Sequence, residues 1–197
     1  QALYSNTTGT YNVAIGYAAL YTNSTGHSNT ANGYYSLYKN TTGEQNTANG
    51  YQVLRYNTTG SYNTANGYQA LRYNTTGNQN TAFGYEALNS NTTGYQNTAN
   101  GRYGLYFNTT GNDNVAIGSK PLFNNTTGNK NVAIGNLAGY NNTTASNNTF
   151  IGSDTNISPT TATWTESTAL GYGALITASN QIVLGRASET VVVPGAM

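Results

Sequence analysis

The chain has 197 residues and a net charge of +1, and only 7% of its residues are charged, against about 25% in ordinary soluble domains. So small a charge gives no field that would attract nucleic acid, and the seven basic residues are scattered along the sequence, so no basic patch is expected. The absence of cysteine excludes disulfides and thiolate metal sites, and no apolar run approaches the roughly 18 residues needed for membrane insertion.

One repeat organises most of the chain. Asn recurs nine times at an unbroken spacing of 17 residues, from Asn12 to Asn148, and a Gly follows it by four residues each time. Leu stands eight residues after this Asn from Leu20 to Leu122, and a second corner, Asn-Thr-Thr-Gly or a near copy, completes the unit. The chain opens inside a unit at Gln1, so we expect its natural start to lie upstream.

A 17-residue unit is too short for helical repeats, which need about 33 residues, and its two Gly and two Asn favour turns. The triplet after the first Asn, such as Thr64-Ala65-Asn66, alternates like a strand. We therefore predict an all-β fold, a parallel β-solenoid (β-roll) of 17-residue coils. Each coil is expected to carry two short strands, stacked about 4.8 Å from the next coil.

Stacking places equal positions of successive units above one another, so identical side chains form ladders along the axis. Ala at the third position and Leu at the ninth are the least variable apolar positions, and we assign them to a narrow core. The second and fourth positions then form an outward stripe that is apolar near the ends, as at Val13/Ile15 and Val132/Ile134, and polar in the middle. An outward apolar stripe indicates a partner surface. The alternative is that these two positions line the core and Ala faces out.

Two ladders are candidate binding surfaces. The first is an aromatic surface that suits sugar stacking or contact with neighbouring chains. It consists of the row Tyr17, Tyr34, Tyr51, Tyr68 and Tyr85, together with Tyr38, Tyr56, Tyr73, Tyr106 and Phe107. The second is a Thr/Asn array, interrupted by Phe83, that resembles the ice-binding faces of antifreeze solenoids: Thr30, Asn32, Thr47, Asn49, Thr64, Asn66, Thr98 and Asn100.

The spacing divides the chain into regular repeats over 1–152, a loop insertion over 153–166 and irregular terminal coils over 167–197. The insertion contains Pro159 and the only tryptophan, Trp164. The segment 190–194, Thr-Val-Val-Val-Pro, is predicted to be a terminal strand that covers the last open edge.

The Asn-Val-Ala-Ile-Gly sequences at 12–16, 114–118 and 131–135 resemble the head repeats of YadA-like trimeric autotransporter adhesins. The full unit resembles still more the repeat region of phage and virus tail-fibre proteins that precedes an endosialidase-type intramolecular chaperone, and residues 180–190 are similar to the stretch just before that chaperone. The resemblance implies left-handed β-rolls packed as an elongated homotrimer, extracellular on a virion or cell surface, that bind host receptors. The 17-residue period and the central Asn residues depart from the family pattern.

Catalytic chemistry is not expected. Six carboxylates occupy different places in the repeat, so no pair is expected to share a substrate bond, and the sole histidine, His27, stands at a solvated corner. We expect no metal site and no cofactor. The sequence thus favours a structural or receptor-attachment segment of a trimeric surface fibre, binding a host-surface glycan or protein. An ice-binding solenoid is the alternative, and a polysaccharide-degrading tailspike is the third reading.

Overall fold

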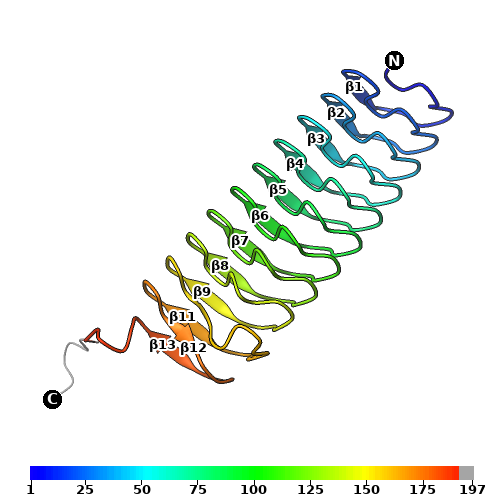
Figure 1. Cartoon of the computed structure of the whole chain (residues 1–197). Coiled ribbons are helices and arrows are strands. Elements are labelled where there is room, and N and C mark those ends of the chain that lie inside the picture. The colour runs from blue at the N-terminus through cyan, green and yellow to red at the C-terminus, as the bar shows by residue number, and fades with distance from the viewer. Residues whose placement is uncertain (191–197) are drawn as a thin grey trace.

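In the computed structural model, which describes residues 1–190, the chain winds into a rod of stacked coils (Figure 1). These residues contain no helix and the following strands: β1 (Val13–Ile15), β2 (Thr30–Asn32), β3 (Thr47–Asn49), β4 (Thr64–Asn66), β5 (Thr81–Phe83), β6 (Thr98–Asn100), β7 (Val115–Ile117), β8 (Val132–Ile134), β9 (Thr149–Ile151), β10 (Asn156–Ile157), β11 (Thr168–Leu170), β12 (Leu175–Ile176) and β13 (Ile182–Leu184). Strands β1 to β9 form one parallel sheet with β11 and β13, and β10 pairs with β12. The predicted all-β parallel solenoid of 17-residue coils is confirmed.

Each regular strand pairs with its equivalent one coil away, so the repeat length sets the register. Strand β3 pairs with β4, for example, through Thr47 opposite Thr64 and Ala48 opposite Ala65. The middle Ala of these strands is fully buried, whereas Thr64 is half-buried and Asn66 is exposed. The reading that places Ala in the core and the second and fourth positions outside is therefore correct.

The core is thin, because each regular coil contributes the Ala of the strand and, on the turn side, the Leu and the small residue before it, such as Ala70 or Val53. The Leu series from Leu20 to Leu122 is fully buried, as predicted. In the eighth coil Gly139 takes the place of Leu, and in the ninth Phe150 takes the place of Ala. A Cβ on Gly139 would lie 2.8 Å from Cδ2 of Phe150, so the larger ring fills the space that the missing Leu leaves.

The prediction of two strands per coil is wrong for the regular coils, which contain one strand each. The other side of the coil is a run of turns in which the buried Leu lies in the left-handed region, with φ of 49° at Leu54 and 50° at Leu71. This conformation is uncommon for residues other than Gly and cannot extend into a strand. The N–H of Leu54 still donates to the Ala70 carbonyl of the next coil at 3.1 Å, so hydrogen bonding between coils persists without β geometry.

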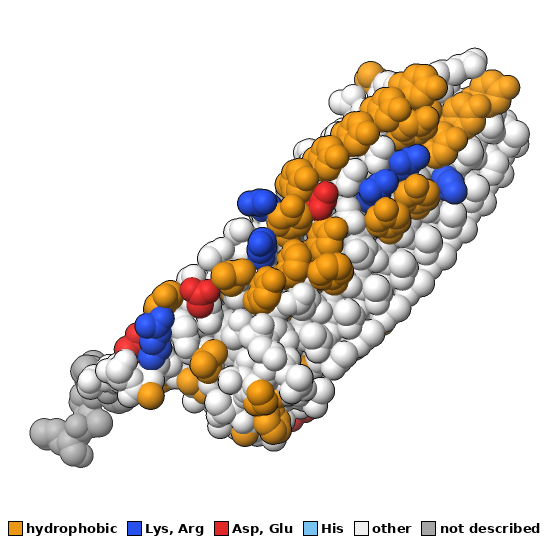
Figure 2. Space-filling model, viewed as in Figure 1, with side chains coloured by type: hydrophobic (Ala, Val, Ile, Leu, Met, Phe, Trp, Pro, Cys, Tyr) orange, Lys and Arg blue, Asp and Glu red, His pale blue; other side chains and the backbone are white. Residues whose placement is uncertain are grey.

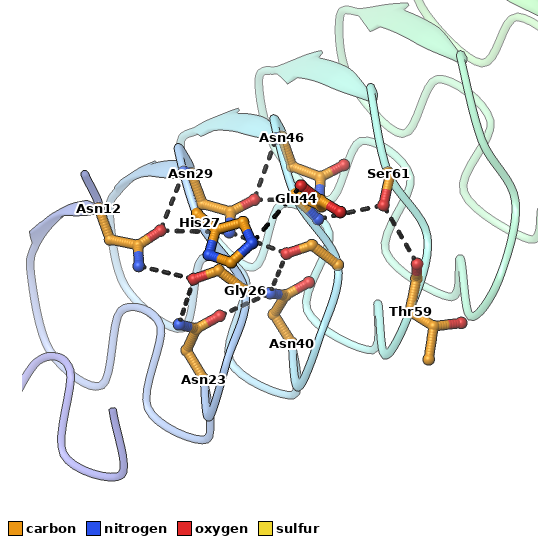
Figure 3. Close-up of polar contacts among 11 residues, drawn as sticks. Asn12, Asn23, Gly26, His27, Asn29, Asn40, Glu44, Asn46, Thr59 and Ser61 are labelled. Atoms are coloured by element: carbon orange, nitrogen blue, oxygen red, sulfur yellow. Dashed lines mark hydrogen bonds and ion pairs between the residues drawn. The ribbon is translucent and has the colours of Figure 1, made fainter. Parts of the chain in front are cut away.

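Two ladders of buried asparagines run along the rod (Figure 3). In the first ladder, Nδ2 of Asn63 lies 3.1 Å from Oδ1 of Asn46, one coil earlier, and 2.9 Å from the carbonyl oxygen of Gly77. In the second ladder, Nδ2 of Asn57 lies 2.8 Å from Oδ1 of Asn40 and donates also to the Gly carbonyl of its own corner. Buried amides are thus satisfied by their own copies in neighbouring coils, except at the end of the second ladder, where Oδ1 of Asn142 accepts no hydrogen bond from the described residues.

The C-terminal coils depart from the repeat. The segment 153–166, predicted as a loop, contains β10, and this strand pairs with β12. Trp164 packs against the core and donates from Nε1 to the carbonyl of Ser158 at 3.2 Å. Residues 191–194 of the predicted terminal strand lie outside the described residues.

The glycines that directly follow each strand, such as Gly67, allow a test of the coil geometry. Gly67 has a φ of +132°, and a Cβ there would collide with the carbonyl of Gly84 in the next coil. Gly67→Val is therefore expected to destabilise the protein by roughly 3 kcal/mol, measured as a lower midpoint of thermal or urea unfolding by circular dichroism.

Gly104→Ala is the matched control. Gly104 stands where other coils carry Ala, its φ is not in the left-handed region, and the nearest atom to an added Cβ is 3.3 Å away. This variant should keep or raise the midpoint. An unchanged midpoint for Gly67→Val would contradict the corner geometry.

Candidate binding surfaces

The predicted Thr/Asn array lies on the outer side of the sheet, over β2 to β6. Its Asn members stand at the fourth position of the unit, and Phe83 interrupts them. Toward both ends the same position is apolar and exposed. We call this set the strand-face row; its apolar members are Ile15, Phe83, Ile117, Ile134, Ile151, Leu170 and Leu184. The outer face is thus polar over the central coils and apolar toward the ends.

The structure brings the five predicted tyrosines together as one stack. The centroids of consecutive rings from Tyr17 to Tyr85 lie 5.0–5.4 Å apart, and the last three pairs are within 7° of parallel. Because each ring covers the face of the next, the stack presents ring edges and hydroxyls to solvent. The row is therefore a poor platform for stacking sugars, and its ring-to-ring contacts stabilise one coil on the next.

Some tyrosine hydroxyls near this stack are perturbed. Desolvation is the largest cause that raises the pKa of Tyr35, Tyr85 and Tyr106 above the ordinary 10.0. The negative charge of Glu86 raises the pKa of Tyr85 and Tyr106 further. These hydroxyls are therefore protonated at neutral pH and act as neutral hydrogen-bonding groups.

A third ladder, which was not predicted from the sequence, runs along the second corner, Asn-Thr-Thr-Gly. The second Thr of each corner is exposed in nine successive coils, and together they form the corner threonine row: Thr8, Thr25, Thr42, Thr59, Thr76, Thr93, Thr110, Thr127 and Thr144. The first Thr of the corner is half-buried, and Oγ1 of Thr58 donates to the carbonyl of Thr75 at 3.0 Å. The unbroken Thr in the corner motif was the signal in the sequence.

One ion pair lies next to the first asparagine ladder, between residues that stand two positions before its Asn (Figure 3). Nε2 of His27 is 3.7 Å from Oε2 of Glu44, which occupies the same position one coil later. Both side chains are about half exposed, so the attraction between them is screened by solvent. Among residues 1–190, no three His, Asp or Glu side chains gather closely enough to hold a metal ion.

Cationic and aromatic side chains meet on the turn side of the second to fourth coils (Figure 2). The Arg55 guanidinium lies 4.8 Å from the centroid of Tyr35 and 5.1 Å from that of Tyr56. Lys39 Nζ lies 5.1 Å from the centroid of Tyr56. We call this group the basic–aromatic cluster; it consists of Lys39, Arg55, Arg72, Tyr35, Tyr56 and Tyr73.

The expectation that the basic residues form no patch is wrong. Lys39 and Arg55 are 16 residues apart and Arg55 and Arg72 are 17 apart, which is scattered in a linear chain. In a solenoid of 17-residue coils the same spacing places the side chains on adjacent coils of one flank. The 17-residue spacing of Arg55 and Arg72 was thus a signal for a patch in the sequence, although the low total charge gave no indication of it.

Comparisons of the chain with protein-family models, with curated proteins and with solved structures found no match. Within the part of the chain that the structure describes, no helix is long and apolar enough to cross a bilayer. Function is therefore inferred from the geometry of the ladders and of the basic–aromatic cluster.

The perturbed tyrosines predict a pH dependence of stability. Because burial raises the pKa of Tyr35, Tyr85 and Tyr106 above 10.0 in the folded chain, their stabilising contribution is complete below pH 10.0 and is lost as the pH rises through the folded pKa values. The thermal midpoint should fall over this range while tyrosinate absorbance grows.

Tyr85→Phe is the control, because Phe retains the ring stack and removes one titrating hydroxyl. Its midpoint should fall less at alkaline pH than that of the unmodified chain. A midpoint that stays constant while these tyrosines ionise would contradict the prediction.

Proposed function

We propose that this chain is a structural and receptor-attachment segment of a trimeric surface fibre, in which three copies lie side by side along their long axes. The observation that carries the proposal is the strand-face row. Its residues Ile117, Ile134 and Ile151 are 37–39% exposed, and Leu170 and Leu184 are each 44% exposed. A continuous outward apolar row is a surface that a soluble rod covers with a partner.

A second copy of this chain is the partner that fits the row. The apolar side chains repeat once per coil, about every 4.8 Å, and a partner must show the same repeat to meet every rung. An identical chain does so in parallel alignment, and exposed amides such as Asn66 then face equivalent amides that donate and accept hydrogen bonds. A net charge of +1 gives little repulsion between copies.

Three copies are proposed because the Asn-Val-Ala-Ile-Gly unit resembles repeats of trimeric adhesin heads and tail fibres. The same resemblance supports an extracellular place on a virion or cell surface. There the fibre binds a host-surface glycan or protein. This role needs no catalytic group, no cofactor and no insertion into a membrane.

Sedimentation tests the assembly directly. The unmodified chain should sediment as a trimer, and the double variant Ile117→Glu/Ile134→Glu should sediment as a monomer, because it places charges on adjacent rungs of the strand-face row. Thr110→Glu is the control, since Thr110 is exposed in the corner threonine row and should leave the trimer intact. A monomeric unmodified chain at micromolar concentration would refute the proposal.

An ice-binding solenoid is a second candidate, and the corner threonine row is the observation that favours it. The row presents nine regularly spaced threonines without interruption, unlike the Thr/Asn array that Phe83 breaks. The fibre proposal expects no thermal hysteresis in a freezing-point assay. Hysteresis that is lost in Thr76→Tyr, which breaks this row, and retained in Asn66→Tyr, which alters the strand face, would favour ice binding instead.

A further inference from the structure

The cations of the basic–aromatic cluster have no anionic partner in the described chain. The one ion pair among residues 1–190 joins His27 to Glu44, at a corner. Glu86, one coil beyond Arg72, lies outside ion-pair distance of Lys39, Arg55 and Arg72. Three positive side chains on three successive coils, roughly 5 Å apart along the axis, therefore create a local positive potential in a chain of low overall charge.

The aromatic rings hold these cations in place. The guanidinium of Arg55 lies against two rings, and that of Arg72 lies 4.8 Å from the centroid of Tyr73 and 6.0 Å from that of Tyr56. The Nε atoms of both arginines are buried and donate to no acceptor among the described residues. The inner part of each guanidinium is thus fixed by packing, which reduces the entropy that an incoming ligand must remove.

The outer nitrogens of the arginines have donor capacity to spare. Nη1 of Arg72 lies 3.4 Å from Oε1 of Gln69, which is a long hydrogen bond, and Arg55 has no side-chain hydrogen bond to an acceptor in residues 1–190. A planar guanidinium with free N–H groups binds a carboxylate or a sulfate in a bidentate manner. The ammonium of Lys39 adds a third positive charge beside Tyr56.

The rings favour a saccharide as the carrier of those anionic groups. Tyr56 and Tyr73 stack on each other with centroids 5.3 Å apart and planes 5° apart, so a flat nucleobase cannot insert between them. Because their faces cover each other, Tyr56 and Tyr73 offer a sugar no flat face for ring stacking, but their hydroxyls donate and accept hydrogen bonds with sugar hydroxyls. Three charges also give only a weak counterion-release term for nucleic acid.

We propose that the basic–aromatic cluster is a binding site for an acidic saccharide chain, in which Arg55 and Arg72 bind carboxylate or sulfate groups and Tyr56 and Tyr73 contact the sugar. The inference rests on the proposed attachment function and names the ligand class for it. The cluster lies on the turn side of the coils, after the buried Leu, whereas the strand-face row lies on the sheet. The basic–aromatic cluster therefore remains exposed when copies of the chain pack through the strand-face row.

Surface plasmon resonance on the full chain tests the site with three immobilised probes: heparin as a sulfated glycan, polygalacturonate as a carboxylated one and dextran as an uncharged one. The chain should bind heparin or polygalacturonate, with an affinity that falls as salt rises, and should not bind dextran. The two acidic probes distinguish sulfate from carboxylate as the group that is recognised. Oligo(dT) is the fourth probe, and tighter binding to it than to either acidic glycan would overturn the proposal.

The variant Arg55→Gln/Arg72→Gln should weaken binding to the acidic probe by about tenfold or more, because hydrogen bonds between charged groups are lost. Lys120→Gln/Lys130→Gln is the matched control, since it removes the same charge from later coils and should change binding by less than about twofold. An equal loss in both variants would show that net charge alone binds the glycan. No binding to either acidic glycan would likewise overturn the site.

The outcome is separable from that of the fibre proposal. Each variant is first checked for an unchanged circular dichroism spectrum and for its mass by sedimentation. A trimer that binds neither acidic glycan refutes the saccharide site and leaves the fibre intact. If the chain is a monomer that binds an acidic glycan, and the Arg55→Gln/Arg72→Gln variant does not bind it, the saccharide site is supported and the trimer is refuted.

Discussion

The buried asparagine ladders are the constraint on which the rest of the rod depends. Along each ladder the Oδ1 of one Asn accepts from the Nδ2 of the Asn one coil later, and an orphaned buried amide costs about 1–3 kcal/mol. The spacing therefore holds at 17 residues for as long as the first ladder lasts. At its end, Nδ2 of Asn148 donates instead to the carbonyl of Trp164, and Oδ1 accepts from the N–H of Ser167, 19 residues away. The coil length changes where the ladder stops.

The thin core follows from the same stacking. A coil whose inward side chains are the strand Ala, the turn-side Leu and the small residue before that Leu buries little apolar area by itself, so its stability comes mainly from contact with its neighbours. A large change of side-chain volume in such a core must be compensated by a neighbouring side chain. The exchange of Leu for Gly139 is tolerated because Phe150, one coil later, enters the space. Outward positions carry no such requirement, and there the composition changes freely from Ile to Asn and back.

Residues seventeen apart could be paired from the sequence, and so the sequence predicted the register, the buried Ala and Leu series and the tyrosine stack. The single strand per coil could not be predicted, because a Leu carries no signal that its φ will be 49°, as at Leu54. That conformation is imposed by the closure of a short coil around a thin core. The basic–aromatic cluster was missed for a different reason. Arg55 and Arg72 stand at equivalent positions and could be paired from the repeat, but Lys39 follows its Leu by two residues instead of one, and only coordinates show that it reaches Tyr56 as Arg55 does.

In a solenoid, the position of a residue within its coil determines which side of the rod it lies on. The number of the coil determines where it lies along the axis. The residues that are the same in every coil form the core and the ladders. Residues that differ between coils must therefore provide any specificity for a ligand. The positions that carry Lys39, Arg55 and Arg72 hold Tyr21 and Thr22 one coil earlier and Asn89 and Ser90 one coil later. The positive strip is therefore bounded to three coils, about 10 Å between its outer charges. A strip of that length suits the proposed ligand, a short acidic segment of a glycan, and the three copies of the proposed trimer would together bind such a chain with greater avidity than one site.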